Sequence, residues 1–450
     1  MRGVLQDGAM PDPVAHLQAL VRLATISRLS LADTDWAPFD SFVALLPELY
    51  PATHATLTRE LVAGHSMLYR WAGRTAGSPT VLMAHYDVVP ATDEGWTHPP
   101  FAAELVGEGE EQLIWGRGTL DDKGSLTAIM EAVEARLAAG YRPECDIYLS
   151  FGHDEETEGS GARAIVELLE NRSIRPSLVI DEGGAVVENI FPGVSGPIAV
   201  VGVSEKGILS LTLTVEQQGG HASTPPRLSA TARLATAIVR LNNRPFRAGF
   251  TPTTTEMIRT LGAHASTPLR WIFTNLWLTK PLLLVLFGRL GPETSAMIRT
   301  TQAVTMLRGS QAANALAERA VATVNIRVAV DSSVAEAVEH VRRAIGDPLV
   351  RLDILHPNEP SPVSPTTGPA WELVRSTIEA TYPGTIVTPY VMMAASDSRH
   401  FARISDFVYR FSPFEMSSEE RGTLHAIDER MHVSTLLSGV EFYIRLIDRL

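Results

Sequence analysis

The sequence has 450 residues, more than one hydrophobic core usually organises, and this length predicts two or three domains. Apolar residues make up 45% and charged residues 20%, a globular balance that excludes general disorder. The net charge of −13 argues against nucleic-acid binding, and the single Cys145 excludes an internal disulfide, a cysteine zinc finger and an iron–sulfur cluster. Any bound metal must therefore have nitrogen and oxygen ligands.

The first half alternates short apolar runs with helical patterns, as in a doubly wound sheet with crossover helices. The predicted elements are strands at 81–84, 146–151 and 177–180 and helices at 126–137 and 162–169. Apolar residues of the first helix recur at three- and four-residue spacing, so it is expected to be amphipathic.

After about Glu205, the chain predicts an α+β layer in which alternating strands have one buried face. The predicted elements are strands at 209–215 and 324–330 and helices at 230–241 and 334–345. Asp331-Ser332-Ser333 can cap the last helix. A proline-rich linker is predicted at 357–369, and helix and strand patterns resume beyond it.

Two segments bear on the location of the protein. The N-terminal MRGVLQDGAMPDP lacks a basic start followed by an apolar run, so no secretory signal is predicted and we expect a cytoplasmic protein. Residues 271–290 are apolar, but Lys280 and Pro281 divide them into halves too short to span a bilayer. We therefore expect a buried or groove-lining helix pair, which could line a groove for an acyl chain or an apolar side chain or simply pack in the second domain.

Acidic groups follow several predicted strands and turns. They are His85-Tyr86-Asp87, Asp121-Asp122, Asp154-Glu155-Glu156 and Asp181-Glu182. In open α/β sheets, ligands bind outside the carboxyl ends of the strands, so these groups can converge in one crevice. Crowded carboxylates are costly unless a cation neutralises them, which predicts a metal site.

Imidazole with carboxylate, and without thiolate, favours zinc, with cobalt or manganese as possible substitutes, over magnesium or calcium. His85 and Asp87 are two residues apart on an extended segment, so Asp87 can accept the second ring proton of His85. Glu155 and Glu156 are adjacent and point in different directions. One of them can bind metal while the other acts as general base toward a bound water.

Each of these features also has a purely structural explanation. A histidine at a strand end can be a satisfied surface residue, an acidic triplet can be solvated or cap a helix, and Asp121-Asp122-Lys123 can open the following helix. Four acidic groups together with glycine-rich turns at 116–118 and 183–184 are difficult to explain as coincidence.

Seven segments carry a family resemblance. They are HYDVVP (85–90), GRGTLDDKG (116–124), GHDEETEGSGA (152–162), DEGG (181–184), GGHASTPP (219–226), SDSRHF (396–401) and LHAIDERMHVS (424–434). In composition and order they closely resemble the dizinc metallopeptidase family of aminoacylase, glutamate carboxypeptidase and carboxypeptidase S. VGVSEKG (201–207) and NLWLTKPLLLVLFGRL (275–290) look most like its carboxypeptidase S branch, which includes the N-fatty-acyl amino acid synthase/hydrolase.

The resemblance implies an α/β fold, a zinc-peptidase-type mixed sheet flanked by helices. It also implies an inserted α+β, ferredoxin-like domain for dimerisation or as a lid. The order of the motifs then predicts a catalytic domain at 1–206 and 356–450, divided by the inserted domain at 207–355.

Carried over by position, the resemblance implies two zinc ions, with His85 and Glu182 on one, Glu156 and His425 on the other, and Asp121 bridging both. With a shared water, each ion approaches the four ligands that zinc prefers. Two positions have competitors. Asp181 stands beside Glu182, although the DEG motif favours Glu182, and His432 competes with His425, although LHxxDER favours His425.

The resemblance also implies roles for residues that do not bind metal. Glu155 takes the position of the general base and Asp87 orients His85. His221, in the GGHAS turn, stabilises the oxyanion in another subunit's site, which predicts a homodimer. Arg399 and Asn314 bind the substrate carboxylate, with Arg327 as a weaker candidate. An ion pair with Asp397 or Asp406 is the structural alternative for Arg399.

The predicted activity is hydrolysis of an amide or peptide bond next to a free carboxylate, by a carboxypeptidase or an N-acyl amino acid amidohydrolase. The alternative is a non-catalytic, dimeric amino-acid or peptide-binding homologue, which predicts loss of the base or a ligand, yet Glu155 and all five proposed ligands are present. A dinuclear phosphoesterase is disfavoured because no phosphate-cradling loop accompanies the carboxylates.

Overall fold

The computed structural model describes residues 12–188 and 190–450. The N-terminal segment considered above for a secretory signal lies outside the described residues, except for its last two positions. The chain divides into two compact units. The first comprises Met1–Val203, Ser364–Pro389 and Ser396–Leu450, and the second comprises Ser204–Val363 and Tyr390–Ala395.

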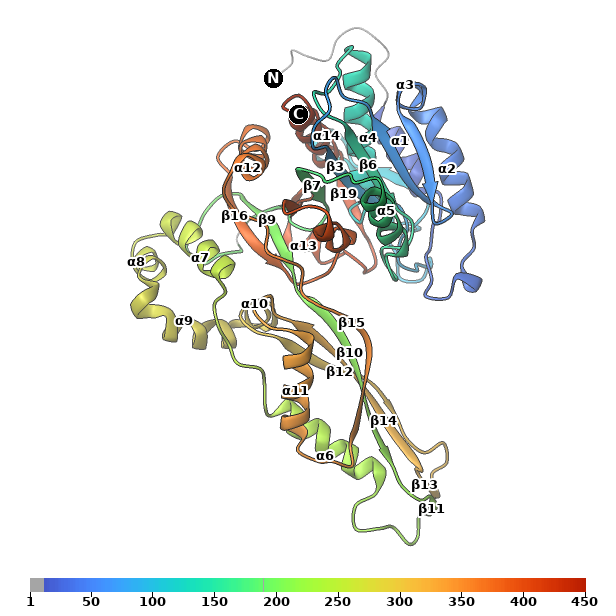
Figure 1. Cartoon of the computed structure of the whole chain (residues 1–450), viewed down its shortest axis with the longest axis vertical. Helices are drawn as coiled ribbons and strands as arrows, with labels where there is room; N and C mark the ends of the chain where they lie inside the picture. Colours follow the sequence, from blue (N-terminus) through green and yellow to red (C-terminus); the bar gives the residue numbers. More distant parts are fainter. Residues whose placement is uncertain (1–11, 189) are drawn as a thin grey trace. The chain divides into compact units, whose positions relative to one another are not determined.

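A ten-stranded mixed sheet forms the centre of the first unit, in the order β1-β2-β6-β3-β7-β17-β9-β8-β18, with β16 also paired to β9 (Figure 1). Its strands are β1 (Thr58–Val62), β2 (Ser66–Trp71), β3 (Thr80–His85), β6 (Ile147–Gly152), β7 (Leu178–Asp181), β8 (Val186–Val187), β9 (Ile198–Glu205), β16 (Ile386–Met392), β17 (Val408–Arg410) and β18 (Glu415–Met416). A smaller sheet contains β4 (Glu104–Val106), β5 (Leu113–Trp115) and β19 (Arg430–His432).

Strands β6, β3, β7 and β17 run parallel to one another, which brings their carboxyl ends to one edge. The predicted strands at 81–84, 146–151 and 177–180 correspond to β3, β6 and β7. All six residues of β3 and of β6 are buried, as expected for central parallel strands covered on both faces.

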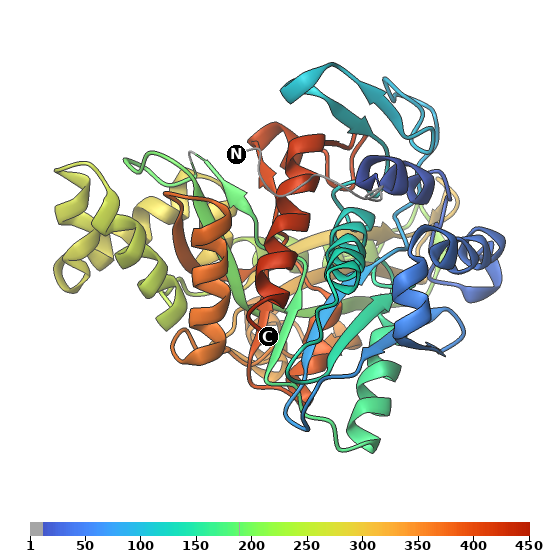
Figure 2. The same cartoon turned by 90° about the horizontal axis from the view of Figure 1, so that it is seen from above.

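Helices cover this sheet. They are α1 (Pro13–Val21), α2 (Ala37–Leu49), α3 (Pro51–Thr56), α4 (Lys123–Ala138), α5 (Ser160–Asn171), α12 (Pro369–Thr381), α13 (Ser418–Arg421) and α14 (Val433–Ile447), with 3-10 turns η1 (Leu31–Asp33), η2 (Gly109–Glu111) and η3 (Asp397–Arg403). The expectation of an amphipathic α4 is wrong, because every residue from Lys123 to Glu134 is buried. Helices α1, α3 and α14 pack against α4, and Figure 2 shows α14 in red beside α4 in teal.

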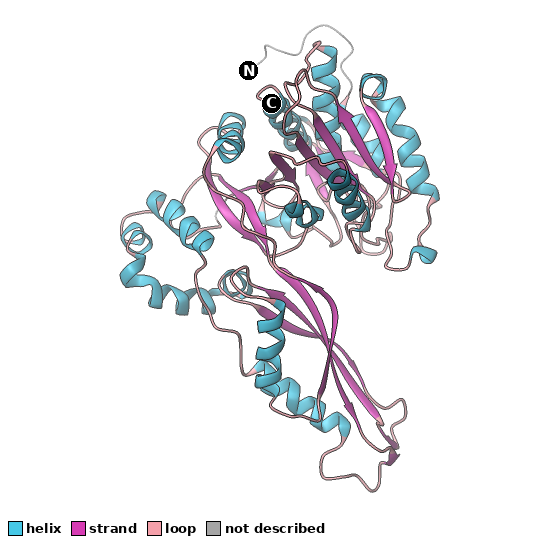
Figure 3. Cartoon of the chain, in the orientation of Figure 1, coloured by secondary structure: helices cyan, strands magenta, loops and turns pink. Residues whose placement is uncertain are grey.

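The second unit contains a four-stranded antiparallel sheet in the order β12-β14-β10-β15. Its strands are β10 (Gly207–Glu216), β12 (Thr301–Arg308), β14 (Arg319–Val328) and β15 (Arg351–Asn358), and β11 (Gly220–His221) pairs with β13 (Ala315–Leu316). Its helices are α6 (Ala230–Asn242), α7 (Pro252–His264), α8 (Leu269–Thr274), α9 (Leu276–Leu290), α10 (Pro292–Met297) and α11 (Val334–Ile345). Figure 3 shows this sheet in magenta with α6 and α11 in cyan beside it.

Alternating side chains of β10 and β14 form the core of the second unit with α6 and α11. Ser333 caps α11 in a capping box with Glu336, as the sequence predicts for this helix start. The strand expected at 324–330 corresponds to β14, whose bounds differ from the prediction. It begins at Arg319, because it pairs with β10 along its whole length, and it ends at Val328. The expected α/β class with a second α+β layer is confirmed.

Candidate metal centre

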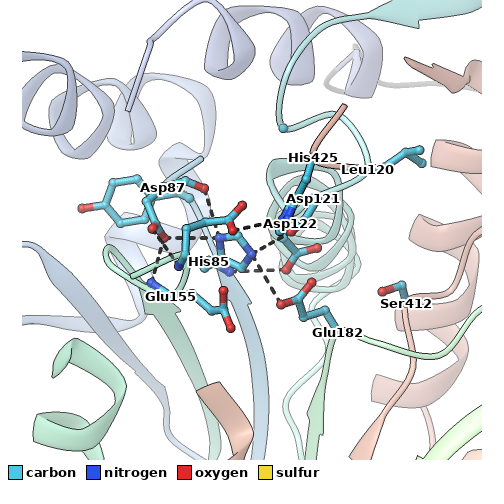
Figure 4. A network of polar contacts seen from close by, with 12 residues as sticks. His85, Asp87, Leu120, Asp121, Asp122, Glu155, Glu182, Ser412 and His425 are labelled. Carbon is cyan, nitrogen blue, oxygen red and sulfur yellow. Dashed lines mark hydrogen bonds and ion pairs between the residues drawn. The ribbon is translucent and has the colours of Figure 1, made fainter. Parts of the chain in front are cut away.

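The acidic groups predicted from the sequence lie together at the carboxyl ends of the parallel strands (Figure 4). His85 is the last residue of β3, and Glu182 directly follows β7. Glu155 and Glu156 belong to the turn between β6 and α5, and Asp121 stands before α4. His425, which lies between α13 and β19, completes the cluster with a positive φ of 58°.

Two groups of potential metal ligands share one carboxylate. In the first, His85 Nε2 lies 2.9 Å from an oxygen of Asp121 and 3.4 Å from one of Glu182. In the second, His425 Nε2 lies 3.0 Å from the other oxygen of Asp121 and 3.0 Å from Glu156. The geometry therefore has the form of two neighbouring cation sites with Asp121 between them.

The electrostatics of the cluster fit divalent cations. Burial raises the pKa of Glu182 to about 8, and Asp121 adds to this shift. Hydrogen bonds to Asp121 and Glu156 raise the pKa of His425 to about 10. Glu156 Oε1 is buried without a hydrogen-bond partner among the described residues. Without a cation, these groups reach neutrality only by holding protons, whereas two cations would balance the carboxylates directly.

Asp87 connects His85 to the loop that carries the two glutamates. Its fully buried carboxylate lies 3.3 Å from His85 Nδ1 and accepts hydrogen bonds from the backbone N–H groups of Glu155 and Glu156, both at 3.1 Å. The backbone oxygen of Asp87 also lies 3.0 Å from His85 Nδ1. Asp87 thus holds the ring so that Nε2 points into the cluster, the orientation predicted for a ligand.

Glu155 is directed into the same space, beside His85 (Figure 4). Burial raises the pKa of its carboxyl well above the usual range, and Glu182 and Asp397 contribute while His85 opposes the shift. Glu155 belongs to neither ligand group, whereas Glu156 contacts His425. Glu155 therefore lies next to the candidate ligands without belonging to them, and its role as general base stays a prediction.

Glu429 holds the loop that carries Asp121, a role that was not predicted from the sequence. Its buried Oε1 accepts hydrogen bonds from the backbone N–H groups of Gly118 at 3.0 Å, Leu120 at 2.9 Å and Asp121 at 3.2 Å. Its Oε2 lies 2.6 Å from Arg117, whose second terminal nitrogen donates to Ala426 O. The glutamate in LHAIDERM was the available signal, because it follows the proposed ligand His425 closely.

The competing ligand candidates lie outside the two groups. Asp181 accepts a hydrogen bond from the backbone N–H of Ser398 at 2.8 Å and is in neither ligand group. His432 Nε2 lies 3.7 Å from Glu420. The arrangement therefore places Glu182 and His425, rather than their competitors, at the cluster.

The proposed substrate-binding residues lie in different units. Arg399, on η3 in the first unit, donates to the backbone oxygens of Ser396 and Glu158. His221 and Asn314 are exposed neighbours in the second unit, where Ala222 N–H donates to Asn314 O at 3.0 Å. Arg327 lies on β14 opposite Ile208. The roles of all four residues remain predictions.

The model of peptidase family M20/M25/M40 matches residues 81–449. The chain belongs to this family. An M20 enzyme is metal-dependent, and the His85 and His425 groups are its candidate metal sites. The resemblance inferred from the sequence motifs is thereby confirmed, together with the prediction of an enzyme.

Relatives with curated descriptions align over nearly the whole M20 chain. A probable carboxypeptidase S-like protein of Dictyostelium discoideum is 36% identical, with 96% of this chain and 84% of the relative covered. An N-fatty-acyl-amino acid synthase/hydrolase of Xenopus tropicalis is 35% identical over 96% and 85%. Carboxypeptidase S of Saccharomyces cerevisiae is 29% identical over 97% and 84%.

Among solved structures, an M20 family metallo-carboxypeptidase from Sulfolobus solfataricus superposes with a TM-score of 0.70, covering 97% of this chain and 99% of that one at 16% identity. Human carnosine dipeptidase 1 superposes with a TM-score of 0.65 over 97% and 96%, also at 16% identity. At these identities the likeness concerns the fold, which is that of the M20 enzymes.

Proposed function

We propose that this M20 enzyme is a dizinc hydrolase that cleaves an amide or peptide bond next to a free carboxylate. The observation that carries the proposal is the pair of ligand groups sharing Asp121, with Glu155 beside them. Zinc suits the donor set because each group combines one imidazole with carboxylates. Bound there, two zinc ions supply Lewis acidity that polarises an amide carbonyl and acidifies water.

In this proposal, side chains of the protein itself perform the proton transfers and hold the reacting groups in position. Glu155 accepts a proton from the water as the water oxygen adds to the carbonyl carbon, and returns it to the leaving nitrogen when the tetrahedral oxyanion collapses and the C–N bond breaks. Asp87 holds the ring of His85 and the backbone of Glu155 in one fixed relationship, through hydrogen bonds of 3.1 Å to the glutamate loop. This preorganisation keeps the base and the ligands at fixed positions relative to one another during turnover.

The substrate class rests on the relatives. A carboxypeptidase releases a residue with a free α-carboxylate, and a hydrolase of N-acyl amino acids acts on a substrate that carries one. The two relatives at 36% and 35% identity bear names of these two kinds. We assign Arg399 and Asn314 to the substrate carboxylate, because a guanidinium offers two parallel donors to it.

We extend the proposal to a homodimer in which His221 of one subunit stabilises the oxyanion formed in the other. In support, His221 and Asn314 are exposed and adjacent, so both are available to one substrate. An imidazole that donates to a developing oxyanion lowers the barrier without contacting the metal.

The deciding experiment is a substrate panel with zinc added. It compares an N-acetyl amino acid, an N-oleoyl amino acid and a dipeptide of the Gly-Leu type, with the Glu155→Gln variant as the background. Release of a free amino acid from at least one substrate, absent from the variant, supports the proposal. If the zinc-loaded protein hydrolyses none of the amides, the proposed function is wrong.

A further inference from the structure

Helix α9 is apolar on two opposite faces. Leu276, Thr279, Leu283 and Phe287 recur at helical spacing and are buried. Leu278, Leu282, Val285 and Leu286 follow the same spacing on the other side, yet these side chains are exposed. A helix that is apolar on all sides is normally buried on all sides. The second face of α9 therefore lacks the packing partner that its composition predicts.

Exposed tryptophans stand close in sequence to these side chains, Trp277 on α9 itself and Trp271 on α8. We call this exposed group the α8–α9 apolar face, and its side chains, with their exposed fractions, are Trp277 83%, Leu282 63%, Trp271 57%, Leu290 54%, Leu278 53%, Val285 52% and Leu286 44%. In Figure 1, α8 and α9 are drawn in yellow at the edge of the group formed with α7. Single exposed apolar residues are ordinary, but a group of this kind marks an interaction surface.

The segment that carries this face, between Glu256 and Glu293, has a charge opposite to that of the whole protein. Residues 257–292 contain no aspartate or glutamate, although the chain carries a formal net charge of −13. The same segment contributes four basic residues, Arg259, Arg270, Lys280 and Arg289, and all four are exposed. Basic side chains and tryptophans around an apolar helix face are the composition of helices that lie in the headgroup region of a membrane.

We infer that the α8–α9 apolar face binds an anionic lipid surface, with α9 lying in the plane of the interface. The leucines and Val285 enter the acyl boundary, Trp271 and Trp277 sit at the headgroup level, and Lys280 and Arg289 reach lipid phosphates. A second copy is a poorer occupant, because joining two identical faces brings their basic residues together without acidic partners. Helix α9 has 15 residues and lies on the surface, so this is adsorption and not insertion across the bilayer.

The test is sedimentation of the full-length chain with vesicles of phosphatidylcholine, or of an equal mixture of phosphatidylcholine and phosphatidylglycerol. We expect binding to the mixed vesicles that weakens as salt is raised, and about tenfold less binding to phosphatidylcholine alone. The double variant W277S/L282N should reduce binding to the mixed vesicles about tenfold. R289E should weaken binding in low salt more than in high salt.

The double variant L29N/L349N is the matched control, because both of its leucines are exposed and lie outside the α8–α9 apolar face. It should sediment like the unmodified chain. Unchanged melting temperatures and unchanged hydrolysis of a short soluble substrate show that each variant is folded. The inference is wrong if W277S/L282N binds the mixed vesicles as well as the control does. It is also wrong if the unmodified chain self-associates without binding vesicles, and W277S/L282N loses only this self-association.

Discussion

The buried carboxylate of Glu429 accepts a hydrogen bond from the backbone N–H of Asp121, at 3.2 Å. The same glutamate neutralises Arg117, which in turn holds the oxygen of Ala426 next to His425. One ion pair therefore fixes two segments that are distant in sequence, each of which carries a candidate ligand. The separation of Asp121 and His425 depends on this ion pair.

Replacing Glu429 with glutamine should lower zinc affinity about tenfold, because the segments of Asp121 and His425 lose their shared anchor. Breaking a buried ion pair also destabilises the fold, by about 3 kcal/mol. Zinc affinity is measured by competition with a chelator and stability by denaturant unfolding. Glu134→Gln is the matched control, because Glu134 is also buried and accepts hydrogen bonds from Ala52 and Thr53 away from the metal centre. Equal zinc affinities in the two variants would contradict the assignment.

If Glu155 is the general base that we propose and not a ligand, Glu155→Gln should lower kcat about a thousandfold and retain zinc. Turnover of the best substrate and zinc content by mass spectrometry are the two measurements. Glu158→Gln, an exposed glutamate on the same turn, should leave both unchanged. A small effect of Glu155→Gln on turnover, with zinc retained, would instead favour a protein that binds and does not hydrolyse.

Zinc binding should release protons. In the metal-free chain, the pKa of Glu182 is raised to about 8 and that of His425 to about 10, so both hold protons near neutrality. Zinc binds only their deprotonated forms, so its affinity should strengthen as pH rises from about 6 to about 8. Calorimetric titrations in two buffers of different ionisation enthalpy give the number of protons released. Heats that do not depend on the buffer would contradict the pKa directions.

His221→Ala should lower kcat about a hundredfold if His221 stabilises the oxyanion. Because we place His221 in the partner's site, mixing this variant with Glu155→Gln should restore activity. Random reassociation leaves half of the dimers mixed, each with one intact site, which gives about a quarter of the original rate. Neither variant alone should recover on the same treatment. Absence of recovery, with dimers verified by light scattering, would place His221 outside the partner's site.

The sequence predicted the positions of the cluster because local patterns determine them. Buried parallel strands are short, mainly apolar runs; β3 ends at His85, β7 ends at Asp181, and His153 follows the last residue of β6. The family motifs then distinguished Glu182 from Asp181, a choice that spacing alone left open. The hydrogen bonds agree, since Asp181 accepts from Ser398.

Other features depend on contacts between distant segments, which local patterns do not contain. Helix α4 was expected to be amphipathic, but α14, about three hundred residues later, covers its other side. The ion pair between Glu429 and Arg117 joins two residues that are 312 positions apart in the sequence. The exposed face of α9 was also not foreseen, because an apolar sequence predicts burial and does not say what covers it.

The position of β17 has a consequence for biosynthesis. This strand lies between β7 and β9 although it is translated long after both. On the ribosome, β7 therefore keeps an unpaired edge while residues 204–363 emerge and form the second unit. His425 is made later still, so the nascent chain lacks one candidate ligand until its final stretch. A chain that ends before β17 therefore has an unpaired β7 edge and lacks the candidate ligand His425.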